Sequence, residues 1–79
     1  MTIKLFGITR EIVGASHIPV PDNQPLKTVA DLKTWLYMEY PSLKQLKSIA
    51  VAVDQSYAED HEVLGAAAEV ALIPPVSGG

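Results

Sequence analysis

The sequence contains no cysteine, and its basic residues are outnumbered by acidic ones. Without cysteine the 79 residues can form no disulfide, thiolate metal site or cysteine nucleophile, which fits a reducing cytosol. The formal net charge of −3 argues against a nucleic-acid partner, because a phosphate backbone binds basic surfaces. No apolar run approaches the roughly 20 residues of a membrane span. We therefore expect one small cytoplasmic domain that binds neither nucleic acid nor membrane.

Side chains that commonly carry out catalysis are equally scarce. The two histidines, His17 and His61, fall on different expected elements, so they are not expected to act together. Asp60 and Glu62 flank His61, but adjacent loop residues rarely converge on one ion, and a solvated polar loop explains them better. No glycine-rich phosphate loop is present. We therefore expect a chain without catalytic side chains, bound metal or bound cofactor of its own.

The hydrophobic pattern predicts several short strands. They occupy residues 2–6, 16–20, 49–53 and 69–73, where apolar positions alternate or dominate. Pro19 cannot donate a ladder hydrogen bond, so the second strand is expected at a sheet edge. Between the strands, residues 10–14 are expected to be a connection and residues 54–62 a polar, turn-like segment.

One main helix is predicted to begin after Thr28 and to end before Pro41. Thr28 is a good N-cap, and Asp31 completes a capping box. An apolar stripe follows at helical spacing, with Trp35 beside it; its members are Val29, Leu32, Leu36 and Tyr40. One stripe covers one face of one sheet, so the other face is expected to be open to water or to a partner.

Residue parity predicts what lies on this open face. Phe6 and Ile73 both fall on the outward set of their strands, together with the small Ala50, Ala52 and Ala71. If the first and last strands are neighbours, Phe6 and Ile73 form an exposed apolar patch. A contiguous patch of this kind usually marks a partner site.

The last residues combine stiffness with small size; they are Pro74, Pro75, Val76, Ser77, Gly78 and Gly79. The prolines fix φ near an extended value, whereas the glycines carry no side chain. Residues 1–73 are therefore expected to form the domain, and residues 74–79 a flexible tail that can place a carboxylate in a narrow pocket of another protein. A frayed end or a truncation is the alternative interpretation.

Gly79 would supply the reactive group of such a tail, its α-carboxylate. A carboxylate is a poor electrophile at neutral pH, because it is charged and stabilised by resonance. An activating partner could convert it with ATP into an acyl-adenylate, and attack by a sulfur donor would then give a thiocarboxylate. A side chain on either of the last two residues would crowd the channel of the partner, which explains both glycines.

The order of elements and the diglycine tail resemble the ubiquitin-like β-grasp family. The ending Glu69-Val-Ala-Leu-Ile-Pro-Pro-Val-Ser-Gly-Gly79 is similar to the Pro-Pro-Val-x-Gly-Gly end of the small, sulfur-carrying subunits of molybdopterin synthase. Weaker matches are Leu5-Phe6, Arg10-Glu-Ile-Val-Gly14, Thr28-Val29 and Ala50-Val-Ala-Val-Asp-Gln55. The resemblance implies an α+β fold: a mixed sheet, one main helix packed on one face, and an extended C-terminal tail.

The resemblance also implies a function without catalytic side chains. A ubiquitin-activating-like adenylyltransferase would use ATP to adenylate Gly79, and a sulfurtransferase system would make the thiocarboxylate. Residues 74–78 would enter the large subunit of molybdopterin synthase, where sulfur passes to cyclic pyranopterin monophosphate in molybdenum cofactor biosynthesis. Two small subunits would flank a dimer of large ones in a heterotetramer. Phe6, Tyr57 and Ile73 correspond to the partner contacts of the family.

The sequence departs from the family pattern at two places, and three alternative functions are also consistent with it. The usual Asp-Gly-Asp-Glu-Val turn reads Ala66-Ala-Ala-Glu-Val70, and Leu72 and Ile73 stand where the family often has aromatics. A sulfur carrier for thiazole or tRNA thiolation would share the chemistry of Gly79, although such carriers generally lack the proline pair. A ubiquitin-like protein modifier would form isopeptide bonds, and a plain β-grasp interaction domain would have an inert tail.

Overall fold

The computed structural model describes residues 1–46, 48–65 and 69–74. Its elements, in chain order, are β1 (Thr2–Leu5), α1 (Ile8–Val13), β2 (His17–Pro19), α2 (Val29–Glu39), the 3-10 helix η1 (Pro41–Gln45), β3 (Ala50–Val53), β4 (Ser56–Ala58) and β5 (Val70–Ile73). The predicted turn at residues 66–68 and residues 75–79 of the tail lie outside the described residues.

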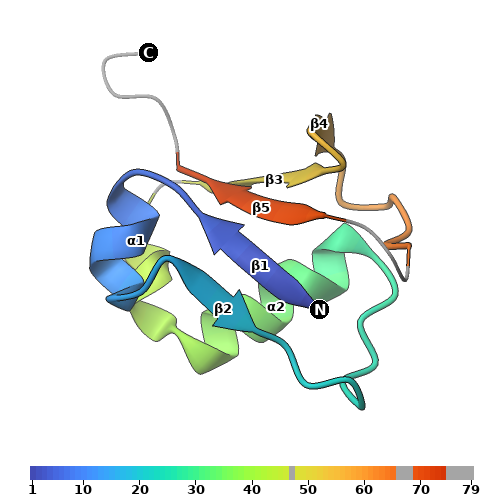
Figure 1. The fold of residues 1–79 in the computed structure, drawn as a ribbon, viewed down its shortest axis with the longest axis horizontal. Helices are drawn as coiled ribbons and strands as arrows, with labels where there is room; N and C mark the ends of the chain where they lie inside the picture. The colour runs from blue at the N-terminus through green and yellow to red at the C-terminus, as the bar shows by residue number, and fades with distance from the viewer. Residues whose placement is uncertain (47, 66–68, 75–79) are drawn as a thin grey trace.

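The strands form one mixed sheet in the order β2-β1-β5-β3-β4. The first and last strands, β1 and β5, run parallel at its centre, and the other neighbours are antiparallel. Helix α2 lies across one face of this sheet (Figure 1). The strand β2, which contains Pro19, is an edge strand as predicted. The predicted α+β, β-grasp architecture is therefore confirmed.

The core lies between the sheet and α2. The predicted helical stripe is buried at Val29, Leu32 and Leu36, each with 0% of its surface exposed, while Trp35 and Tyr40 pack half-buried at its margin. Opposite them are the inward residues of the strands: Ile3, Leu5, Ile18, Val51, Val70 and Leu72. The alternation of buried and more exposed positions along β1 and β5 agrees with the predicted parity.

Two elements differ from the prediction. The expected connection at residues 10–14 is part of helix α1, which Gly14 ends in a left-handed conformation with its N–H donating to the Arg10 carbonyl. Six residues are too few to show a helical period, so sequence periodicity could not reveal it. Ile12 and Val13 of α1 are partly buried and pack against the core.

The other difference is β4, a strand of three residues within the segment that we expected to be turn-like. Its sequence is too short and too polar to show alternation. The turn before it creates the strand: Asp54 and Gln55 have φ values of 51° and 70°, and two positive φ values in succession are what a type I′ hairpin turn requires. This turn folds Ser56–Ala58 back onto β3 and completes the sheet.

Candidate functional site

The face of the sheet opposite α2 carries one row of side chains across four strands. Lys4 of β1 lies beside Ala71 of β5, Ala71 lies beside Ala52 of β3, and Ala52 lies beside Tyr57 of β4. The two alanines at the middle of the row are short, whereas the residues around them are long. The register therefore creates a depression in the centre of the open face.

The depression is a hollow of about 250 Å³. It is lined by Phe6, Ala52, Gln55, Tyr57, Glu69, Ala71 and Ile73. Phe6 is 39% exposed and Tyr57 is 75% exposed, and the Lys4 ammonium lies 5.3 Å from the centre of the Phe6 ring, close enough for a cation–π contact. An apolar centre with a polar rim is the usual composition of a protein interface.

All three residues that the sequence placed at a partner interface line this hollow. Tyr57 lies on β4, Ile73 ends β5, and Phe6 directly follows β1. The structure brings the three together on one face. Their role in binding a partner stays a prediction. Sequence reasoning missed Gln55 and Glu69, because the hairpin turn and the neighbour of each strand have to be known before their positions follow.

The tail begins at the same face. Ile73 ends β5 and lines the hollow, and Pro74 follows it directly. Pro74 is half-buried. The other predicted tail residues, Pro75, Val76, Ser77, Gly78 and Gly79, lie outside the described part of the chain.

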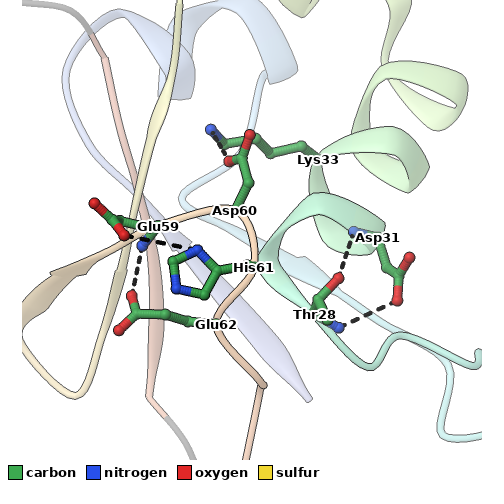
Figure 2. A network of polar contacts seen from close by, with 7 residues as sticks. All are labelled: Thr28, Asp31, Lys33, Glu59, Asp60, His61 and Glu62. Carbon is green, nitrogen blue, oxygen red and sulfur yellow. Dashed lines mark hydrogen bonds and ion pairs between the residues drawn. The ribbon is translucent and has the colours of Figure 1, made fainter.

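The polar run around His61 supplies backbone acceptors to the first turn of the main helix. The Val29 and Ala30 N–H groups donate to the Glu62 and Asp60 carbonyls, at 3.0 and 2.9 Å. Figure 2 shows that Lys33 reaches Asp60, with 2.7 Å between Nζ and Oδ1, while His61 faces Glu59. Among residues 1–46, 48–65 and 69–74, no three potential ligands gather to hold an ion.

The predicted capping box is present at the start of α2. Thr28 Oγ1 accepts a hydrogen bond from the Asp31 N–H, and Asp31 Oδ2 accepts from the Thr28 N–H, as Figure 2 shows. The Lys27 N–H also donates to Asp31 Oδ2. These backbone donors, Thr28 first and then Lys27, hold the pKa of Asp31 below its ordinary value of 3.8. The helix therefore begins with its N-terminal N–H groups satisfied.

A family model described as the ThiS family matches residues 3–79 of this chain. The chain belongs to the ThiS family. The match covers both the sheet that forms the hollow and the diglycine segment. The resemblance that the sequence suggested is therefore confirmed at the level of the family.

The relatives of this ThiS-family chain are named either as sulfur carriers or as protein modifiers. It is 29% identical to the molybdopterin synthase sulfur carrier subunit of Arabidopsis thaliana, over 98% of this chain and 80% of that protein. It is also similar to the crystal structure of SAMP1, small archaeal modifier protein 1, from Haloferax volcanii: 30% identity, a TM-score of 0.77, and coverage of 99% of this chain and 97% of that one.

A further solved structure shares the fold. The protein–protein complex of subunits 1 and 2 of the molybdopterin-converting factor from Helicobacter pylori contains a chain with 22% identity and a TM-score of 0.64, covering 99% of this chain and 96% of that one. In this ThiS-family chain, none of the helices that the structure describes has the length and apolar character needed to cross a bilayer.

Proposed function

We propose that this chain is the sulfur carrier subunit of a molybdopterin synthase and that the Gly79 carboxylate is its reactive group. The observation that carries the proposal is the ThiS family match over residues 3–79, which extends through the diglycine. The similarity to the Arabidopsis sulfur carrier subunit supports the choice of acceptor pathway. The proposal requires that Gly79 be the terminal residue of the active protein.

The chemistry follows from the carboxylate. A Gly79 oxygen attacks the α-phosphate of ATP on an adenylyltransferase, and pyrophosphate leaves. Hydrosulfide attacks the acyl carbon, and AMP leaves with the former carboxylate oxygen. The product is a thiocarboxylate. Its sulfur displaces an oxygen leaving group from a carbon of cyclic pyranopterin monophosphate in the large subunit, which gives a thioester. Water then cleaves the acyl–sulfur bond, so that the sulfur stays on the pterin and the Gly79 carboxylate is restored.

The open sheet face supplies the docking surface in this proposal. The hollow holds an apolar side chain of the large subunit between Phe6, Ile73 and Tyr57, with Ala52 and Ala71 as its floor. Because Ile73 continues directly into Pro74, binding at the hollow brings the tail to the same partner. The complex of subunits 1 and 2 from Helicobacter pylori supports a large-subunit partner. A heterotetramer and a cytoplasmic location belong to the proposal.

The similarity to SAMP1 favours a second candidate, a ubiquitin-like protein modifier. A modifier and a sulfur carrier share the acyl-adenylate at Gly79 and differ in the nucleophile that attacks it. A lysine amine would give an isopeptide bond, whereas a sulfur donor gives a thiocarboxylate. Covalent conjugates of this chain in a lysate, with the Gly79 carbonyl on lysine, would favour the modifier.

Variants at the chain end test the carrier proposal. Deletion of Gly79, or extension by one residue after it, shifts the terminal carboxylate by one residue in either direction without touching the core. We expect both variants to lose sulfur transfer to cyclic pyranopterin monophosphate in the presence of the large subunit. Their thermal unfolding should match that of the wild type. Normal transfer by either variant would contradict the proposal.

Charge substitutions on the open face test the docking surface. We expect Phe6→Asp and Ile73→Asp to weaken binding to the large subunit by about 10-fold or more, since a buried unpaired carboxylate is costly at an interface. Met38→Asp is the matched control, because Met38 is 74% exposed on α2, which covers the opposite face. Titration calorimetry measures all three affinities. Wild-type affinity of both sheet-face variants would show that this face is not the interface.

A further inference from the structure

The backbone between β1 and α1 turns sharply at Gly7. Gly7 has φ 55° and ψ −136°, a region that residues with a side chain rarely adopt. The conformation directs the chain away from the sheet and into α1 within one residue (Figure 1). The need for glycine here would be explained by this turn alone, but the surroundings of Gly7 add a second reason.

Gly7 lies against Pro74. Strands β1 and β5 are parallel, and Leu5 is paired with Leu72. Gly7 and Pro74 each lie two residues beyond this pair, so they are neighbours as well. A Cβ on Gly7 would lie 3.0 Å from Pro74 Cγ and 3.8 Å from Cδ. Carbon atoms in favourable contact are about 3.5–4.0 Å apart. The absence of a side chain on Gly7 therefore allows the proline ring its position.

The turn that carries Gly7 is held firmly. Thr9 is fully buried, and its Oγ1 both accepts from the Phe6 N–H, at 3.1 Å, and donates to the Phe6 carbonyl. The Thr9 and Arg10 N–H groups donate to the carbonyls of Phe6 and Gly7, at 3.2 and 3.1 Å. A side chain added at Gly7 would clash with Pro74. The turn could not move to relieve this clash without losing these hydrogen bonds, so Pro74 would have to move.

We propose that Gly7 is a positioning residue for sulfur transfer, acting through the ring of Pro74. The bare backbone of Gly7 sets the place and orientation of the Pro74 ring, and the ring fixes φ at Pro74. The direction of the backbone at Pro74, the residue at which the chain leaves the open face, is then a property of the folded domain. The inference rests on the proposed role of Gly79, and adds a residue that lies on neither the tail nor the hollow.

A double-mutant cycle separates this contact from backbone strain. Gly7→Ala adds the methyl group, and Pro74→Ala removes both ring atoms that it would approach. The readout is thiocarboxylation by the activating enzyme, with KM and kcat for the carrier measured at a temperature where thermal unfolding shows every variant folded. We expect Gly7→Ala to raise KM about 10-fold with kcat unchanged, and to have a much smaller effect in the Pro74→Ala background, because the two residues are coupled.

Gly14→Ala is the control for strain. Gly14 also has a positive φ, 82°, but a Cβ there would meet no atom within 4 Å. This variant should lose thermal stability and keep the wild-type KM. Equal effects of Gly7→Ala in the two Pro74 backgrounds, or a KM change in Gly14→Ala, would overturn the proposal by showing that strain alone lowers activity.

A nuclear Overhauser effect between the Gly7 α-protons and the Pro74 γ-protons tests the contact without any variant. Its presence supports the contact and its absence overturns it, even if Gly7→Ala does not fold. Failure of the proposed function has a different signature. In that case the wild-type chain itself would not be thiocarboxylated, although the nuclear Overhauser effect would be observed.

Discussion

The hairpin turn between β3 and β4 offers a substitution that should stabilise the protein. Gln55 has φ 70°, in the left-handed region, which costs a residue with a side chain about 1–2 kcal/mol relative to glycine. Glycine also stabilises the unfolded chain by about 0.5–1 kcal/mol, because it has more conformational entropy there, and this offsets part of the gain. We therefore expect Gln55→Gly to raise the free energy of unfolding by about 0.5–1 kcal/mol. For a domain of this size the unfolding midpoint rises by about 2–8 °C.

The neighbouring position provides a matched control with a different expected sign. Asp54 also has a positive φ, 51°, but its Oδ1 accepts a hydrogen bond from the Glu69 N–H at 2.9 Å, and aspartate tolerates this region better than glutamine. Asp54→Gly should therefore leave stability unchanged or lower it by about 1 kcal/mol. Urea titration of both variants measures the difference. A destabilised Gln55→Gly, or equal stabilisation by both, would refute the type I′ turn.

Two further predictions concern the core and the capping box. Leu36→Ala should lower the free energy of unfolding by roughly 2–5 kcal/mol, because Leu36 is fully buried. Met38→Ala on the same helix should change it by less than about 0.5 kcal/mol. Equal losses of the two variants in chemical denaturation would show that the helical stripe is misassigned. The pKa of Asp31 is lowered in the folded state, so its stabilisation is complete above the ordinary value of 3.8 and is lost as the pH falls through the folded pKa. The stability difference between the wild type and Asp31→Asn should shrink over that range, and a difference independent of pH would contradict the hydrogen bonds to Asp31.

The sequence predicted those elements whose pattern repeats. The α2 stripe and the alternation in β1 and β5 extend over enough residues to define a period, and the parity of Phe6 and Ile73 followed from it. The capping box was readable because its two members are separated by a fixed spacing. These local rules predicted the main helix and four of the strands, whereas the β-grasp fold class followed from the resemblance to the ubiquitin-like family.

The elements that were missed depend on contacts between distant segments. Helix α1 and strand β4 are too short to show a period. The hollow needs the register of four strands, because its floor joins Ala52 of β3 to Ala71 of β5 and its wall includes Tyr57 of β4. The Gly7–Pro74 contact likewise follows only from the parallel pairing of β1 and β5. No pattern within one segment could indicate any of these.

The central claim is that Gly79 carries activated sulfur, and the intact mass of the protein tests it most directly. The purified chain is incubated with ATP, hydrosulfide and an activating enzyme that is competent on another carrier. The mass before the reaction establishes whether the active protein ends at Gly79. We predict a gain equal to the replacement of one oxygen by sulfur, located by fragmentation at Gly79. An unchanged mass under these conditions would contradict the account.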